Sequence, residues 1–387
     1  MGARLEECFS DSLSLGPEVE IKTALARLPA RRGLVLFADD RNRPIQLLIC
    51  ADIRRTARAR LIRTTQPSAR KTDISVLCKT VYYTPQDSEF ACRLLYHRLC
   101  HQFFENRFSE LVLLPSPCFV KLDKRAMLPY FLVTENPMQK KDVAVFGPFI
   151  TRKNAIAFAE ALNEAFGLCR NPDCLSPGRY ESCPYLQMKT CPSPCRDEKP
   201  PDSYRHAVEA SLAAVMDDAE TSVRSKENEM RQAAAHLDYE KARRIRDQIE
   251  KLKELKKSDY RLIRPLKRFR WLHIDRIVGP RKSLSFCAFL ITAEQTIELD
   301  SFNLDQTEVF LEKLSTFSVA ASKTNPTQIK EHLAAVCLFL YRNRRPGVWF
   351  DCSGNHYPDT NSLKRLLSEA SDDTKNNNRH PIPPEKR

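Results

Sequence analysis

The feature that most constrains the fold of this chain is a break in phase between two apolar stripes. Residues 204–257 consist almost entirely of strong helix formers. Apolar residues there recur at helical spacing in two sets, the first Met230, Ala234 and Leu237, the second Ala242, Ile245, Ile249 and Leu252. The step from one set to the next is five residues, so one continuous helix would place them on different faces.

Asp238 lies at this break and accounts for it. Aspartate is a favoured helix N-cap, and Glu240 follows in the first turn, where the helix dipole favours negative charge. The sequence therefore predicts two helices folded back at Leu237–Asp238, an αα-hairpin over about residues 226–257. Such a short hairpin buries only one side of itself. Its remaining apolar stripe requires a partner, either within this chain or in another protein.

The rest of the chain predicts a multi-domain α/β protein. Before the hairpin we expect strands at "GLVLF", "IQLLIC", "CFVKLD" and "PYFLVTE", a turn at "VFGPF" and an amphipathic helix at 152–166. After it, "RWLHIDRIV", "LSFCAFLIT" and "QTIELDSF" predict an antiparallel meander, and "PTQIKEHLAAVCLFLYRNR" a helix. The expected segments are a lead-in (1–24), a small α/β domain (25–110), an α/β connector (111–168), a cysteine region (169–203), a helical region (204–257), an α+β domain (258–372) and a disordered tail (373–387).

A cysteine-rich stretch precedes the helical region. Cys183, Cys191 and Cys195 are spaced C-x7-C-x3-C among three prolines, and Cys169 precedes them, with Cys174 as a spare. Thiolates are soft ligands, so four of them suit zinc or an iron–sulfur cluster. Zinc ligands usually come in close pairs, and only Cys191 and Cys195 do so here. Buried structural thiols are the remaining alternative.

The formal charge of +13 indicates a polyanionic partner, for which a nucleic-acid backbone is the default, and plain solubility charge is the alternative. Only 9 glycines are present, which argues against Gly-rich nucleotide-binding loops. One short segment concentrates arginines suited to phosphate contact, with a solvated charged face as the alternative. Its members are Arg54, Arg55, Arg58, Arg60 and Arg63.

Nothing in the sequence indicates a membrane protein. No apolar run reaches the roughly 18 residues that a membrane-spanning helix needs, and "MGARLEECFSDSLSLG" has no signal-peptide core. We therefore expect a cytoplasmic protein without a membrane partner. In that reducing compartment the 14 cysteines are expected to be unpaired.

Several motifs in this order resemble the UvrC family, the nuclease component of the excinuclease ABC that carries out bacterial nucleotide excision repair. They are "FGPF" at 146–149, an amphipathic helix, "CR" at 169–170, the C-x7-C-x3-C loop with "CPSPC", and "LDYEKARRIRDQI" at 237–249. The resemblance covers roughly residues 25–256. It implies a [4Fe–4S] cluster held by Cys169, Cys183, Cys191 and Cys195, with zinc possible in the same four-thiol site.

The hairpin resembles the UVR motif of that family, which pairs with a matching hairpin on the damage-binding protein UvrB. The resemblance implies a UvrB-like partner, whereas a hairpin packed on its own chain is the alternative. The residues implied in partner contact are Met230, Ala234, Leu237, Tyr239, Ala242, Arg246, Asp247 and Ile249.

Residues 28–61 resemble the frame of the family's GIY-YIG nuclease domain but not its active site. The two tyrosine positions fall on Val35 and on Leu47 or Leu48, and the metal-binding glutamate position falls on Tyr96. A hard metal ion prefers oxygen ligands, so the expected anchor is missing, although Glu89 is a possible substitute. We therefore predict a degenerate domain.

The family's second nuclease also lacks a clear counterpart here. His273 and Asp275 on one strand are a weak trace of it, and residues 258–387 are too few for that nuclease and its DNA-binding repeats. We expect a non-cleaving DNA-repair protein that docks a UvrB-like partner and binds DNA. The alternatives are an endonuclease with a non-standard site and a regulatory interaction module with an iron–sulfur cluster.

Overall fold

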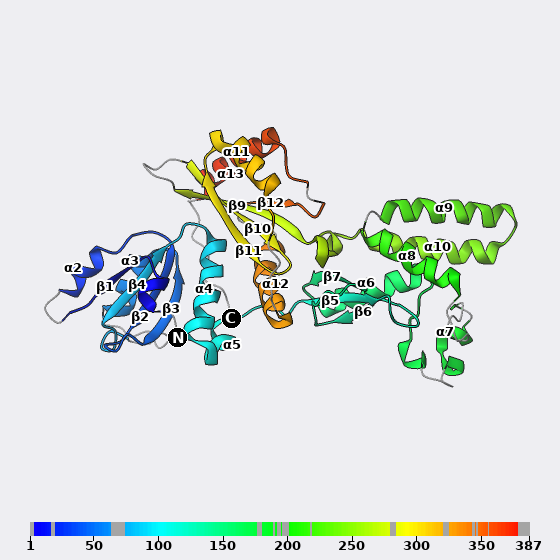
Figure 1. Ribbon diagram of the computed structural model, residues 1–387, viewed down its shortest axis with the longest axis horizontal. Helices are drawn as coiled ribbons and strands as arrows, with labels where there is room; N and C mark the ends of the chain where they lie inside the picture. Colours follow the sequence, from blue (N-terminus) through cyan, green and yellow to red (C-terminus); the bar gives the residue numbers. More distant parts are fainter. Residues whose placement is uncertain are drawn as a thin grey trace.

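The protein was analysed as a computed structural model that describes residues 4–16, 20–62, 74–175, 180–188, 190–191, 195, 201–216, 219–278, 284–319, 325–342, 345, 347–354 and 356–377. Three four-stranded sheets are distributed along an elongated molecule, and a helical hairpin projects at the end farthest from the first sheet (Figure 1). The mixed α/β class predicted from the sequence is confirmed.

Each sheet is antiparallel throughout its described pairings. The first has the order β1-β4-β2-β3, the second β6-β5-β7-β8 and the third β11-β10-β9-β12. The strands are β1 (Asp11–Ser14), β2 (Gly33–Ala38), β3 (Pro44–Cys50), β4 (Thr80–Pro85), β5 (Cys118–Asp123), β6 (Leu132–Thr134), β7 (Val143–Phe149), β8 (Arg264–Pro265), β9 (Arg270–Val278), β10 (Leu284–Thr292), β11 (Thr296–Phe302) and β12 (Val348–Asp351).

Helices cover these sheets. Those in the described part of the chain are α1 (Leu5–Cys8), α2 (Ile21–Ala26), α3 (Ile53–Leu61), α4 (Glu89–Phe103), α5 (Phe108–Leu111), α6 (Arg152–Ala165), α7 (Pro184–Gln187), α8 (Asp202–Met216), α9 (Ala219–Ala235), α10 (Tyr239–Glu254), α11 (Thr307–Thr316), α12 (Pro326–Leu340) and α13 (Thr360–Asn377). Short 3-10 turns lie at Glu105–Arg107, Pro172–Leu175, Tyr180–Ser182, Ser258–Tyr260, Leu266–Arg268 and Leu304–Gln306.

The first sheet is buried on both faces, which explains why β2 is apolar without alternation. Leu34 and Leu36 pack with α4, whereas Val35 and Phe37 pack with α2 and α3. All four side chains are fully buried. The strands expected at "GLVLF" and "IQLLIC" and the basic helix after them are confirmed.

The turn expected at "VFGPF" is wrong, because β7 continues through it and pairs with β5 and β8. Glycine next to proline is typical of turns. Here Gly147 has φ +151, and a Cβ added to it would lie 2.8 Å from Cδ1 of Phe119. The glycine therefore lets this strand pass close to a buried aromatic ring.

Other parts of the middle sheet follow the sequence more closely. The strand expected at "PYFLVTE" is shorter than predicted and forms β6, while the helix expected at 152–166 is α6. α6 and α8 cover this sheet through Phe158, Leu162, Val208 and Leu212. β8 completes the sheet, although it lies beyond residue 258, where the C-terminal domain was expected to begin.

The third sheet contains the predicted meander β9-β10-β11, with β12 beside β9. Its two faces carry different helices: α11 and α13 pack on one, α12 and the start of α4 on the other. α13 continues to Asn377 and so includes residues 373–377 of the expected tail, whose disorder stays a prediction. The side chains of Leu363 and Leu367 anchor this helix in the core. Residues 378–387 lie outside the described residues.

Candidate functional site

The hairpin of α9 and α10 reverses direction at Leu237, as the phase break predicts (Figure 1). Leu237 has φ +57, and the amide of Asp238 donates to the carbonyl of Ala233 at 2.9 Å. This is the left-handed termination typical of helix C-termini. The Asp238 carboxylate then accepts a hydrogen bond from the amide of Lys241 at 3.0 Å and caps α10.

The inner apolar stripe of the hairpin is covered by this chain itself. Ile245, Ile249 and Leu252 are buried, and they pack with Ala233 of α9 and with Ala165 at the end of α6. Of the residues expected to contact a partner, Ile249 therefore lies inside the chain, and Met230 and Ala242 are partly buried against the same cluster. Packing on the hairpin's own chain accounts for this stripe.

The end of the hairpin is different. Leu237 is 70% exposed and Tyr239 is 66% exposed, so two large apolar side chains stand in solvent on either side of the capping aspartate. Ala234, Arg246 and Asp247, also expected in partner contact, are exposed as well. We refer to Leu237 and Tyr239 together as the hairpin tip. An exposed aromatic–aliphatic pair of this kind is typical of a protein-binding surface.

The cysteine segment, which runs from Cys169 to Cys195, follows α6 and is hydrogen-bonded to α8. The amide of Cys169 donates to the hydroxyl of Tyr204 at 3.2 Å, and that hydroxyl donates to the carbonyl of Pro129 at 2.8 Å. Cys183 immediately precedes α7, and the amide of Cys191 donates to the carbonyl of Tyr185 at 3.2 Å. The two hydrogen bonds of Tyr204 attach the start of the segment to α8 and to the loop before β6, whereas the bond from Cys191 to Tyr185 lies within the segment.

Arg170 braces the same segment. Its Nη2 donates to the carbonyl oxygen of Thr190 at 3.0 Å and lies 3.1 Å from the hydroxyl of that residue. The guanidinium also stacks 4.0 Å from the ring centroid of Tyr185. One arginine thus joins the two ends of the loop that carries Cys183.

The four predicted ligand thiols lie in one segment of the chain and influence one another electrostatically. The pKa of Cys169 is raised to about 11, mainly by burial, with smaller contributions from the thiols of Cys191, Cys195 and Cys183. Burial also raises the pKa of Cys195, again with contributions from Cys191 and Cys183. Four soft donors in one segment match the chemistry of a thiolate-bound metal. Within the described ranges, no three Cys, His, Asp or Glu side chains converge closely enough to hold a metal ion.

The basic helix α3 presents only part of its charge to solvent. Arg55 and Arg58 are exposed, whereas Arg54 and Arg60 are half-buried. Nε of Arg54 donates to the carbonyl of Leu28 at 2.6 Å, so this guanidinium is engaged within the fold. Arg63 lies outside the described residues.

The positions expected to correspond to nuclease residues hold apolar or engaged side chains. Val35 and Leu47 are buried in the first sheet, Leu48 is partly buried, and the Tyr96 hydroxyl donates to the carbonyl of Leu111 at 3.3 Å. The possible substitute, Glu89, lies 2.9 Å from Nη1 of Arg342. Its carboxylate is therefore paired with a cation from the C-terminal region.

His273 and Asp275 do come together on β9, with Nε2 3.2 Å from Oδ2, but both are buried. The hydroxyl of Ser88 donates to the same carboxylate. Sequence reasoning missed this serine, and its only local signal was the N-cap position before α4. The group joins two parts of the chain rather than forming an open site.

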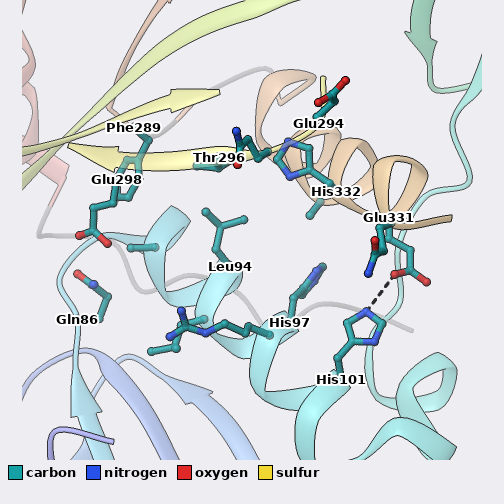
Figure 2. Close-up of a pocket in the computed structure, with 16 residues that line it drawn as sticks. Gln86, Leu94, His97, His101, Phe289, Glu294, Thr296, Glu298, Glu331 and His332 are labelled. Atoms are coloured by element: carbon teal, nitrogen blue, oxygen red, sulfur yellow. Dashed lines mark ion pairs between the residues drawn. The ribbon is translucent and has the colours of Figure 1, made fainter. Parts of the chain in front are cut away.

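Sequence reasoning also missed a cavity of about 660 Å³ between α4 and the third sheet. Figure 2 shows His97 and His101 of α4 projecting into it opposite His332 and Glu331 of α12. Nε2 of His101 lies 3.0 Å from Oε2 of Glu331. Burial lowers the pKa of His97 and of His332 to about 4, so both imidazoles are neutral at physiological pH. The histidine pair one turn apart on α4 was a visible but unused signal.

No helix in the described part of the chain has the length and apolar character needed to span a bilayer.

Comparison with known proteins gives matches in the middle of the chain. The family model for the UvrC/Cho excinuclease middle domain matches residues 117–214, and the model for the UvrB/uvrC motif matches residues 220–255. No solved structure matches the chain.

Curated relatives match about a third of the chain. The UvrABC system protein C of Syntrophomonas wolfei is 36% identical over 121 residues, covering 30% of this chain and 20% of that protein. The protein of that name from Campylobacter jejuni subsp. doylei is 28% identical over 137 residues, covering 35% and 22%. The one from Chlorobium chlorochromatii is 25% identical over 148 residues, covering 35% and 24%.

The chain therefore spans only 20% to 24% of the length of these curated relatives. The matched part contains α6, the cysteine segment, α8 and the hairpin, which are the elements that form the site described above. The expected likeness of residues 25–110 to a GIY-YIG domain stays a prediction. Because residues 117–214 match a UvrC-type middle domain and residues 220–255 match a UVR motif, this part of the chain is UvrC-like.

Proposed function

We propose that this protein acts in nucleotide excision repair by docking a UvrB-like partner through the hairpin tip. The observation that carries the proposal is the contrast between the two apolar surfaces of one UVR motif. The inner stripe is covered by α6, while Leu237 and Tyr239 are exposed. Large exposed apolar side chains, with exposed charges such as Arg246 and Asp247 farther along α10, suit a hot spot whose register is set by electrostatics.

Calorimetric titration of the full chain with a UvrB-like protein tests this proposal. Tyr239→Ala removes an aromatic anchor and is expected to weaken binding about tenfold or more. Arg246→Glu reverses an exposed charge on α10, about two turns from the tip, and is expected to abolish retention. Lys253→Gln is a matched control, since Lys253 is exposed on the same helix and paired with Glu250. Equal affinities for all four proteins would contradict docking through the tip.

The protein is further proposed to be non-cleaving. Support comes from the apolar side chains of Val35 and Leu47 and from the pairing of Glu89 with Arg342. We expect no strand incision when the protein is incubated with damaged duplex DNA, a UvrA/UvrB pair and Mg²⁺. Incision that Glu89→Ala abolishes would instead establish a non-standard active site.

DNA is the proposed polyanionic partner of α3. Arg55 and Arg58 are exposed on this helix, and loss of two phosphate contacts lowers the salt dependence of duplex binding by about two units of slope. The double change Arg55→Gln/Arg58→Gln tests this expectation by fluorescence anisotropy across a salt series. Arg107→Gln is the control, because Arg107 is paired with Glu110. An unchanged slope in the double variant would exclude α3 as the DNA contact.

We also propose that Cys169, Cys183, Cys191 and Cys195 hold a [4Fe–4S] cluster, which would fasten the cysteine segment to the middle domain. Support comes from four thiols on one braced segment. Iron, sulfide and zinc should be quantified in anaerobically purified protein and in Cys191→Ser, with Cys8→Ser as the control outside the segment. Stoichiometric zinc would mean that the four cysteines hold zinc and not an iron–sulfur cluster. Absence of both iron and zinc would contradict a metal site at these cysteines.

A further inference from the structure

A second cavity, of about 440 Å³, lies between the end of α6, the cysteine segment and the hairpin. Thr190 and Cys191 line it on the cysteine side, and residues of α9 and α10 line it on the hairpin side. The start of α8 also lines it, through Ser203, Tyr204 and Ala207. This volume is in the range of pockets that hold small ligands. We call this cavity the hairpin pocket.

The hairpin pocket is predominantly cationic. Its lining contains Arg170, Lys226, Lys241 and Arg244, against the carboxylates of Glu164 and Glu229. Glu164 is already compensated, because Nζ of Lys251 lies 3.4 Å and Nη1 of Arg170 lies 3.9 Å from its carboxylate. On the hairpin side, Lys226, Lys241 and Arg244 then face only the carboxylate of Glu229, so a net positive charge remains there.

Lys226 places a partly buried ammonium group at this cavity. Its Nζ donates to Oε1 of Gln248 at 2.7 Å and lies 5.5 Å from the ring centroid of Phe166. Among the residues that the structure describes it forms no ion pair, and Glu229 acts on it only at longer range. Burial lowers the pKa of this lysine, which reflects the cost of withdrawing an ammonium group from water. A bound anion would offset that cost.

The other cations are placed to reach the same anion. Lys241, Arg244 and Gln248 lie on α10 at spacings of three and four residues, so they share one face of the helix. Arg170 is fixed by Thr190 and Tyr185, which makes the opposite wall rigid. Donors held on two sides of one cavity suit a group with several acceptor oxygens.

We propose that the hairpin pocket binds a phosphate group of a nucleic-acid strand, with Lys226, Lys241 and Arg244 as its contacts. Phosphate offers several oxygens to separately placed cations, as this lining requires. Phe166, which is only partly buried, adds aromatic surface to the lining, on which a base can rest. The site lies outside α3 and uses none of the tip residues, so it does not depend on the proposed docking.

The test is anisotropy of a labelled single-stranded oligonucleotide of about 12 nucleotides, a length within the usual site sizes for single-strand binding. Arg244→Gln should weaken binding about fivefold and reduce the slope of log K against log salt by about 0.7, the value for one phosphate on a single strand. Lys226→Met should behave alike. Arg243→Gln is the matched control, because Arg243 is exposed, adjacent in sequence and absent from the pocket lining.

Inorganic phosphate identifies the source of the anion. Displacement of the oligonucleotide by phosphate beyond that caused by chloride of equal ionic strength means that an isolated phosphate group fills the pocket. Displacement equal to that by chloride means that the strand itself is required. Either result supports the proposal when Arg244→Gln and Arg243→Gln differ.

Equal effects of Arg243→Gln and Arg244→Gln would overturn it, since only diffuse surface charge would then be involved. A loss of UvrB-like binding in Arg244→Gln with unchanged oligonucleotide affinity would also overturn it, because the pocket would then serve a protein contact. The two proposals fail separately. Tyr239→Ala is expected to keep oligonucleotide affinity, and Arg244→Gln is expected to keep partner affinity.

Discussion

The hydroxyl of Ser88 donates a hydrogen bond to Oδ2 of Asp275, although 187 positions of sequence separate the two residues. Ser88 also accepts a hydrogen bond from the amide of Ala91 at 3.0 Å, which caps α4. His273 lies 3.2 Å from the same carboxylate, and all three polar side chains are buried. One serine thus starts the helix that packs on the first sheet and fastens that helix to an inner strand of the third.

Ser88→Ala is expected to lower the free energy of unfolding by about 2–3 kcal/mol. The change removes a helix cap and leaves a buried carboxylate with one donor fewer. Urea unfolding followed by circular dichroism measures the effect. Ser368→Ala serves as the control, because that hydroxyl is exposed and bonds only within α13, and a change of about 0.5 kcal/mol or less is expected there. Equal losses in both variants would deny a structural role for the Asp275 contact.

Stability is expected to fall as the pH drops from about 6.5 toward 4, partly through His332. Burial lowers the pKa of this imidazole from 6.5 to about 4. Between those values the unfolded chain binds more protons than the folded one, so acid favours unfolding, and the contribution is fully present above pH 6.5. His332→Gln should flatten this part of the pH profile of the urea midpoint. His236→Gln, on the exposed end of α9, should leave the profile unchanged, and parallel profiles for wild type and His332→Gln would contradict the assignment.

Gly347→Ala is expected to destabilise the protein by about 2 kcal/mol or more. Gly347 has φ +63, and an added Cβ would overlap Oδ1 of Asp275 and the carbonyl oxygen of Ile274. Gly354→Ala is the control, since its nearest neighbour is the side chain of His356 and its backbone is not in the left-handed region. Thermal unfolding compares the two variants. A smaller loss at Gly347 than at Gly354 would mean that the Asp275 environment adapts freely.

Local patterns predicted the parts of the fold that local physics determines. The phase break and Asp238 located the hairpin turn, and the apolar run at "GLVLF" located β2, because helix caps and strand burial act over a few residues. The turn expected at Gly147 was wrong because a glycine is required there by the close approach of Phe119, a residue 28 positions earlier, and not by a turn in the local chain. Local pattern cannot supply such a distant contact.

For the candidate site too, the sequence predicted the local motifs but not the contacts between distant segments. Sequence located the UVR motif and the four cysteines, but it could not separate Ile249 from Tyr239, since both belong to the motif. Only the packing of Ala165 against the inner stripe shows that one is covered and the other exposed. The hairpin pocket was likewise invisible, because Arg170, Lys226 and Arg244 come from three separate segments.

The central claim, that the hairpin tip binds the partner, is tested most directly by Leu237→Gly. Glycine adopts φ +57 without strain, so this change removes an exposed apolar side chain while preserving or slightly raising stability. Calorimetric titration with a UvrB-like protein, alongside a thermal melt, is the measurement. The account predicts an unchanged or higher Tm and affinity reduced about fivefold or more. Wild-type affinity in a folded Leu237→Gly variant would contradict it.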